Sequence, residues 1–461
     1  MTFSTLNTSK IVIAAAPCSA KWSAIKRTSF KSTHHLLLIS HHSKNLVHFK
    51  REILSNGLKV LVHEDYSTPL AAVNVAFDVG SRDEDPEKTG FAHLFEHLMF
   101  AGSKNVKDFD EPLQNAGGDN NAYTTNDYTT FYESIPAQNI ETALWLESDR
   151  MLDLNINKKS LEVQRRVVVE EFKETCLNEP YGDMWHHLSE LMYQKHPYRW
   201  PVIGLVPEHI ERATLDDVRA FYERWYHPAN AVLSICGPIK SDEAFRLAEK
   251  WFADIPAGPA GFQRQLVLEP PQTEHRTKIV HSPQVPVPAV FIAFRMPGRL
   301  DPEFYPTDTI TDVLAEGRSA RLFRHLLKEK QLFSQIDAYV TANTDPGLLV
   351  IEGRPSEGVS PETAIDAIWA ELEALKNETL PLRELDKIKH RFESTIVFSE
   401  LSIMNKAQNL GLFELLNGAE HMNNEVGLYM AITPDDIQRA ARRFLTKENS
   451  ATLIYVPEAR G

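Results

Sequence analysis

The sequence has only three cysteines, Cys18, Cys176 and Cys236, and no C-x-x-C pair. An odd and small number of cysteines excludes a disulfide framework and favours a reducing compartment. Long hydrophobic runs are also missing, because apolar stretches such as 11–16 and 36–39 are far shorter than the roughly 18 residues that cross a bilayer. We therefore expect no membrane span and a cytoplasmic location.

Acidic residues are absent from the first 51 positions, which carry eight of the 49 lysines and arginines. This composition, rich in Ser, Thr and His, is typical of an organelle transit peptide, although a disordered tail or an upstream translation artefact explains it equally well. We expect residues 1–50 to be an N-terminal extension, with the mitochondrial matrix as the location if they target the chain, and the periplasm as a weaker alternative. All 63 acidic residues lie beyond it, and such an acidic body disfavours a nucleic-acid partner.

The chain of 461 residues is about three times the length of a typical domain, and its second half repeats its first. The segment AVNVAF at 72–77 matches AVFIAF at 289–294, an offset of 217 that also relates Arg82 to Arg299. Near the end of each half a Phe-containing helix precedes a strand, in FYERWYHPANAVLSI and RRFLTKENSATLIYV. We predict an α+β fold of two similar, duplicated domains, each a mainly antiparallel sheet packed with helices.

Composition and periodicity give the boundaries. We place the first domain at 51–253, the second at 278–461, and a linker at 254–277, where four prolines interrupt any periodicity. The elements that we expect in the first domain are two strands within 51–64 around an Asn56-Gly57 turn, a strand at 71–79, a helix from Gly90 to Gly102, a strand at 124–135, helices at 140–174 and 215–226, and a buried strand at 231–236.

The first of these helices contains His93-Leu-Phe-Glu96-His97. Residues i and i+4 of a helix lie one above the other, so His93 and His97 can share one Zn²⁺ at about 2.0–2.1 Å. Glu96 flanks the same face and can accept a proton from a water whose pKa the metal lowers. The alternative is a core helix with two incidental histidines, because the residues between them are apolar.

Catalytic zinc needs a third protein ligand and an open position. The helical segment 161–175, LEVQRRVVVEEFKET, offers Glu170 and Glu171. Spacing alone does not choose between the two, and a surface location for both is the ordinary state of such an acidic pair.

The motif His93-x-x-Glu96-His97 is the inverted zinc motif of the inverzincins, and the chain resembles the pitrilysin-like zinc metallopeptidases, in particular their bacterial processing-peptidase-like members. The resemblance spans about 51–461 and includes HLFEHLMFAGS, NNAYTTNDYTTFYE, LWLESDRM, QRRVVVEE, EPYG and HPYRWPVIG in the family's order. It implies Zn²⁺ bound by His93, His97 and Glu171, Glu96 as the base, and a metalloendopeptidase that hydrolyses peptides or unfolded segments.

Three further positions carry over from the family. Asn121-Ala122 matches an edge strand to which a substrate peptide adds as a β-strand, with the Asn side chain assisting at the scissile carbonyl. A turn residue after Gly117-Gly118 is an equally good interpretation of Asn121. Gln164 stands where many relatives have a Glu that supports the metal ligands, and an amide can orient a ligand but adds no charge.

One departure from the family affects the expected partner. Complete sites in the family use an Arg and a Tyr, seven residues apart in the second domain, to bind substrate and stabilise the oxyanion. Lys328 and Gln335 occupy those positions here, and they lack the planar fork of Arg and the phenol of Tyr. We therefore expect a heterodimer in which a homologous partner subunit supplies the Arg and Tyr. The alternatives are a monomer or homodimer in which Lys328 or another group substitutes, and a non-catalytic core or assembly subunit of a larger complex.

Overall fold

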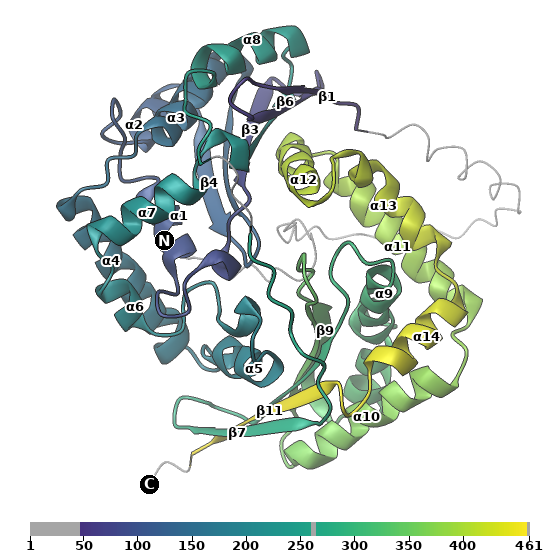
Figure 1. Ribbon diagram of the computed structural model, residues 1–461. Helices are drawn as coiled ribbons and strands as arrows, with labels where there is room; N and C mark the ends of the chain where they lie inside the picture. Colours follow the sequence, from purple (N-terminus) through teal and green to yellow (C-terminus); the bar gives the residue numbers. More distant parts are fainter. Residues whose placement is uncertain (1–46, 260–263, 459–461) are drawn as a thin grey trace, which may run out of the picture.

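A computed structural model describes residues 47–259 and 264–458 (Figure 1). The basic extension expected at 1–50 lies outside the described residues except for its last four. Within those four, the Val47 side chain is buried and its backbone N–H donates to the Asn423 side chain at 2.9 Å. The folded structure therefore includes Val47.

The first sheet has six strands in the order β1-β2-β6-β3-β5-β4. Its strands are β1 (Lys50–Ile53), β2 (Lys59–Glu64), β3 (Leu70–Phe77), β4 (Asp119–Thr124), β5 (Thr129–Pro136) and β6 (Ala231–Gly237). The β2–β6 pair is parallel and the other four pairs are antiparallel. The predicted turn joins β1 to β2, with Gly57 at a φ of 89° and its N–H bonded to the Leu54 carbonyl.

The second sheet repeats this arrangement. Its strands are β7 (Arg276–Ser282), β8 (Ala289–Arg295), β9 (Phe333–Val340), β10 (Leu348–Pro355) and β11 (Ser450–Pro457). They lie in the order β7-β11-β8-β10-β9, with β7 and β11 parallel. Each of these strands has a counterpart at the same place in the order β2-β6-β3-β5-β4 of the first sheet. The matching segments 72–77 and 289–294 lie in β3 and β8, which have the same place in these two orders, so the predicted α+β duplication is confirmed.

The helices follow the same order in both halves. Those of the first half are α1 (Phe91–Leu98), α2 (Asp110–Asn115), α3 (Ile140–Leu152), α4 (Lys158–Phe172), α5 (Met184–Met192), α6 (Pro207–Glu211), α7 (Leu215–Trp225) and α8 (Ser241–Phe252). Those of the second half are α9 (Phe304–Ala315), the π-helix η7 (Leu322–Glu329), α10 (Pro361–Asn377), α11 (Leu382–Ser399), α12 (Ile403–Leu416), α13 (Glu420–Ala431) and α14 (Pro434–Phe444). Counted from β3 and from β8, the helices correspond in chain order. The pairs are α1 with α9, α2 with η7, α3 with α10, α4 with α11, α5 with α12, α6 with α13 and α7 with α14.

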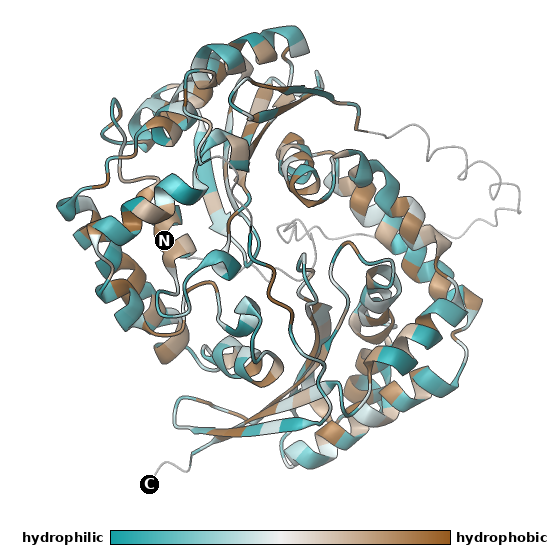
Figure 2. Cartoon of the chain, in the orientation of Figure 1, coloured by the Kyte–Doolittle hydropathy of each residue, from teal (hydrophilic) through white to brown (hydrophobic). Residues whose placement is uncertain are grey.

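Amphipathic patterning explains how these helices pack. Figure 2 shows hydrophobic and hydrophilic residues alternating around the outer helices, as expected for helices with one buried face. Among the described residues, no helix combines the length and the apolar character that crossing a membrane requires.

The helix before the last strand of each sheet begins in the same way. Thr214 caps α7 by accepting the backbone N–H of Asp217, and Thr433 caps α14 by accepting that of Asp436. The carboxylate of each aspartate in turn accepts the backbone N–H of the threonine, which completes a capping box. The repeat seen near the end of each half therefore extends to the caps of its helices.

Each half covers the sheet of the other with one helix. Leu188 and Met192 of α5 pack against the second sheet, whereas Ala407 and Leu410 of α12 pack against the first (Figure 1). Gly411 lies so close to the first sheet that a Cβ added there would stand 2.7 Å from the Asn74 side chain. Since α5 and α12 are counterparts, the two halves are joined by an exchange of equivalent helices.

The loops that meet between the halves are also counterparts. The Asn343 side chain donates to the side chain of Asn126, which lies 217 residues earlier. Arg82 forms ion pairs with Asp127 of the first half at 2.8 Å and with Asp345 of the second at 3.1 Å. This buried polar contact fixes the two sheets relative to each other.

Two predicted elements differ from the structure for local reasons. The single strand expected at 124–135 is divided into β4 and β5, because a turn at 125–128 lets the Thr125 N–H bond to the Tyr128 carbonyl. The helix expected at 140–174 is interrupted after Leu152, and α4 begins afresh where the Asn157 side chain caps it. In addition, α1 ends at Leu98, before the expected stop at Gly102.

Candidate metal centre

The start of α1 is fixed by a buried carboxylate. Gly90 caps the helix with a φ of 88°, and a Cβ there would stand 2.7 Å from the Ile203 carbonyl. The two carboxylate oxygens of Glu84 accept the N–H groups of Gly90 and Ala92, each at 2.8 Å. Burial raises the pKa of Glu84 well above its usual value, and these two hydrogen bonds oppose the rise. Sequence analysis missed Glu84, because it lies in a loop and belongs to no motif.

The end of α1 is held from α3. The Asp149 carboxylate accepts hydrogen bonds from the Ser103 hydroxyl at 2.6 Å and from the Asn105 backbone and side chain at 3.0 and 2.6 Å. The neighbouring Arg150 is buried and lies over the rings of Phe109 and Phe131 at 4.3 Å. The segment LWLESDRM thus orients the chain that leaves α1.

One face of α1 packs in the core and the other carries the motif. Leu94, Phe95 and Leu98 are fully buried in the core of the first half. The two histidines lie on the other side, with their Nε2 atoms 3.3 Å apart. The i,i+4 spacing thus places the rings side by side, as predicted.

The helix α4 packs against α1 and brings Glu171 to the histidines. Its Oε2 lies 3.6 Å from Nε2 of His93 and 3.3 Å from Nε2 of His97. Glu170 points elsewhere, forms an ion pair with Lys173 and has a side chain that is 72% exposed. Glu171, which the resemblance implied as the third ligand, is therefore the member of the acidic pair that lies next to the histidines.

These three residues, His93, His97 and Glu171, form what we call the trio. Ligand atoms at about 2.0–2.1 Å from a tetrahedral ion are about 3.3–3.4 Å from one another, close to the separations of 3.3–3.6 Å found here. Two imidazoles and a carboxylate are also a common donor set for zinc in enzymes. Among the described residues, the trio is the one group of three or more His, Cys, Asp or Glu whose ligand atoms cluster in this way. The residues present therefore fit a zinc ion.

The electrostatics of the trio favour metal-binding protonation states. Burial lowers the pKa of His93, which keeps its imidazole neutral. Burial opposes ionisation of Glu171, but the hydrogen bond with His97 and the electrostatic interactions with the two histidines outweigh it and lower the pKa of Glu171. Neutral imidazole and ionised carboxylate are the forms that bind a cation.

Glu96 lies between the trio and the edge of the first sheet. Its Oε2 accepts a hydrogen bond from the Thr124 hydroxyl of β4 at 2.6 Å. Thr124 was not singled out from the sequence, although it falls in the segment NNAYTTNDYTTFYE. This hydrogen bond fixes the carboxylate of the predicted base next to an edge strand.

The two β4 residues expected to bind substrate point in opposite directions. Ala122 packs toward the core that contains α1, whereas Asn121 is exposed, pairs with Tyr132 of β5 and accepts the N–H of Ala122 at 2.8 Å. Thr124, rather than Asn121, is therefore the β4 side chain that contacts Glu96, and the role of Asn121 stays a prediction.

Gln164 lies two helical turns before Glu171 on α4 and is half-buried. Within the described part of the chain it forms no hydrogen bond with the trio. Its supporting role also stays a prediction.

The two replaced positions of the second half are exposed. Lys328, near the end of η7, has its Nζ 5.4 Å from the Phe323 ring centre, and Gln335 lies in β9 opposite Arg354. Neither forms a hydrogen bond or ion pair with the trio in the part of the chain that the structure describes.

Comparison with known proteins places this fold among two-domain peptidases. The crystal structure of a protease from Helicobacter pylori matches with a TM-score of 0.86 at 27% identity, over 89% of this chain and 100% of that chain. The chain belongs to the pitrilysin-like M16 peptidase family: the model described as "Insulinase (Peptidase family M16)" matches residues 59–204, and "Peptidase M16 inactive domain" matches 212–392. The trio lies within the first match.

Two curated relatives extend this assignment. The chain is 28% identical over 412 residues to "Zinc protease PqqE" of Helicobacter pylori, covering 88% of this chain and 92% of the relative. It is 26% identical over 426 residues to "Probable mitochondrial-processing peptidase subunit beta" of Schizosaccharomyces pombe, covering 86% of this chain and 89% of the relative. These similarities support a metallopeptidase.

Proposed function

We propose that the protein is a zinc-dependent metalloendopeptidase, with Zn²⁺ bound by His93, His97 and Glu171. The observation that carries the proposal is the approach of three ligand atoms from two helices to tetrahedral separations. Relatives named zinc proteases support the choice of metal and reaction class.

A bound Zn²⁺ would supply a Lewis acid that polarises the scissile carbonyl and makes water acidic enough to attack near neutral pH. In this proposal Glu96 accepts the proton of the attacking water and then holds it for the leaving amine. The Thr124 hydroxyl keeps the Glu96 carboxylate in place through its hydrogen bond.

The edge strand β4 is the proposed substrate platform. Its outer side is unpaired among the described strands, so a peptide or unfolded segment can add to the sheet through main-chain hydrogen bonds. Asn121 and Ala122 would contact this peptide, and recognition through the main chain would tolerate many sequences.

We further propose that the protein works as the zinc-bearing subunit of a heterodimer. Lys328 and Gln335 replace the Arg and Tyr that complete the site in the family, so a homologous partner would provide these side chains. The Schizosaccharomyces pombe relative is itself named as a subunit, which supports an assembly.

The test compares the purified chain alone with the chain combined with the product of any homologous neighbouring gene. We expect one zinc per chain in both samples and cleavage of an unfolded protein only in the second. A Glu96→Gln variant should keep its zinc and lose activity by about 10²–10⁴-fold. Glu170→Gln on the exposed side of α4 is the matched control. A chain without zinc contradicts the metal assignment, and equal activity in both samples contradicts the partner.

A non-catalytic core or assembly subunit is the second candidate. It is favoured by the description "inactive domain" for the model that matches 212–392 and by the exposed Lys328 and Gln335. Stoichiometric zinc without proteolysis in any pairing would support it over the peptidase.

A further inference from the structure

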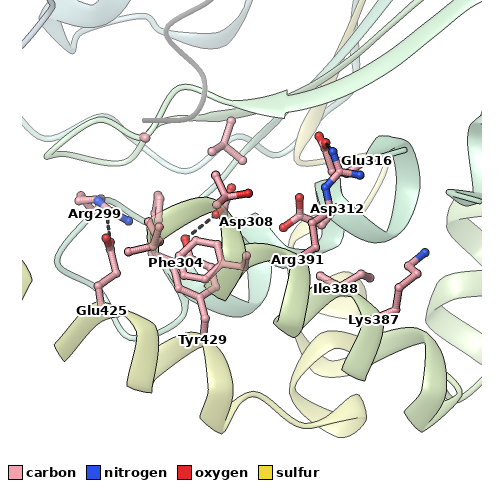
Figure 3. A pocket seen from close by; sticks show the side chains of 15 residues that line it. Arg299, Phe304, Asp308, Asp312, Glu316, Lys387, Ile388, Arg391, Glu425 and Tyr429 are labelled. Atoms are coloured by element: carbon pink, nitrogen blue, oxygen red, sulfur yellow. Dashed lines mark hydrogen bonds and ion pairs between the residues drawn. The ribbon is translucent and has the colours of Figure 1, made fainter. Parts of the chain in front are cut away.

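The second half contains a cavity next to the helices that correspond to those of the trio. In the first half, α1 and α4 hold the trio between them, and their counterparts in chain order are α9 and α11. The cavity lies between α9, α11 and α13 and has a volume of about 160 Å³ (Figure 3). The trio and the cavity therefore lie on counterpart helices of the two repeats but differ in chemistry.

Apolar side chains line one part of this cavity, and the charged residues Arg299, Asp308, Asp312, Glu316, Lys387, Arg391 and Glu425 line another. Phe304, Val340, Ile388 and Tyr429 line it and are all buried. Asp308 of α9 also lines it, and its side chain is drawn among these residues in Figure 3. Only 7% of Asp308 is exposed, so its charge is largely removed from water.

The hydrogen bonds of Asp308 are incomplete. One carboxylate oxygen, Oδ2, accepts the Tyr429 hydroxyl at 2.5 Å (Figure 3). The other, Oδ1, has no hydrogen-bond partner in the part of the chain that the structure describes. A buried carboxylate accepts up to four hydrogen bonds and normally lies beside a cation, so this oxygen lacks a donor.

The cations around the cavity are bound to other groups. Arg299 interacts electrostatically with Asp308 but forms an ion pair with Glu425, and Arg391 is paired with Glu316. The Lys387 Nζ donates to the Ser319 hydroxyl at 2.9 Å. None of the three forms a hydrogen bond with Oδ1 among the described residues, so a cation from outside the chain would complete the site.

We propose that this cavity binds an alkylammonium or alkylguanidinium group, with the cation against Asp308 and the alkyl stem between the apolar side chains. The volume fits one such group, because an apolar cavity of about 150 Å³ holds a molecule the size of benzene. The same group occurs in free small amines and in the lysine and arginine side chains of peptides. This site is independent of the trio and of the proposed peptidase activity.

Calorimetric titration with n-butylguanidinium tests the proposal on the full-length protein. We expect saturable binding, and about tenfold to hundredfold weaker binding of n-butylurea, which has a similar shape but no charge. Asp308→Asn should weaken n-butylguanidinium binding by a similar factor, because the amide still accepts from Tyr429 but has lost its charge. Asp386→Asn, on the exposed side of α11, is the matched control.

A second variant keeps the test decisive if Asp308→Asn folds poorly. Val340→Phe would fill the cavity and leave Asp308 charged, so it should also abolish binding. Competition by the peptide Ac-Ala-Ala-Arg-Ala-Ala-NH₂ would identify a peptide side chain as the source, and binding of the free cation alone would identify a small amine. No saturation by n-butylguanidinium, or equal binding of n-butylurea, would overturn the proposal.

Discussion

The trio between α1 and α4 and the cavity beside α9 and α11 lie on counterpart helices in two copies of one fold. The first presents two imidazoles and a carboxylate whose ligand atoms converge. The second pair of helices borders a cavity lined by both apolar and charged residues, among them the buried carboxylate of Asp308. The comparison shows that counterpart helices of the two repeats carry different side chains, and these side chains decide what each pair of helices can bind.

The largest expected effect is on zinc binding, which distinguishes the trio from the corresponding helices of the second half. His97→Ala should weaken zinc binding by more than about 100-fold, because even residues that merely support metal ligands contribute about 10–100-fold. Asp312→Asn, in the corresponding helix α9, should leave the zinc content unchanged. Metal analysis after dialysis measures both, and equal loss in the two variants would contradict the assignment of the metal to the first half.

The next prediction concerns the packing of α12 from the second half against the sheet of the first half. Gly411→Val places a side chain where α12 touches Asn74 of the first sheet, and overpacking of this kind costs about 1–3 kcal/mol. Denaturant unfolding should show a single transition whose midpoint lies at a lower denaturant concentration than that of the wild type. Gly427→Val in α13 has no neighbour within 4 Å of its added Cβ and tests the effect of the residue type alone. Equal shifts for both variants would argue against close packing as the cause.

The two capping boxes provide a more symmetric comparison. Thr214→Ala and Thr433→Ala each remove one cap, and each should reduce the free energy of unfolding by about 1 kcal/mol. Thermal unfolding of the two single variants measures this. If only one of the two variants loses free energy of unfolding, the two capping boxes do not contribute equally to stability.

The last prediction concerns an acid at the corner between α11 and α12. Burial raises the pKa of Glu400 to about 7, and the charge of Lys406 opposes the rise. Because the folded pKa lies above the unfolded one, this group favours the folded state at low pH, and that contribution is lost as pH rises toward 7. Glu400→Gln should therefore raise the melting temperature relative to wild type at pH 8 and have little effect at pH 4. A constant difference across this range would contradict the shifted pKa.

The sequence was informative wherever a pattern is local. The i,i+4 histidines, the strands at 72–77 and 289–294 and the Asn56-Gly57 turn could be predicted, because period and turn chemistry are properties of neighbouring residues. The acidic pair at 170 and 171 could not be resolved by spacing alone, since the choice depends on how α4 is rotated against α1.

Contacts between distant segments were not visible in the sequence. Glu84 supports α1 from a loop, and Thr124 supports Glu96 from a strand that the sequence pattern merged with the next one. The exchange of α5 and α12 was also missed, because an amphipathic pattern shows that a helix has a buried face and not which sheet covers it.

The crossed placement of α5 and α12 has a consequence for dividing the gene. A cut in the linker would separate each sheet from the helix that covers it. Either fragment made alone would then expose an apolar sheet face and an apolar helix face that has lost its packing partner. Co-expressed fragments could instead recognise each other through those same surfaces, and reassembly of the split protein would then report directly on the exchange.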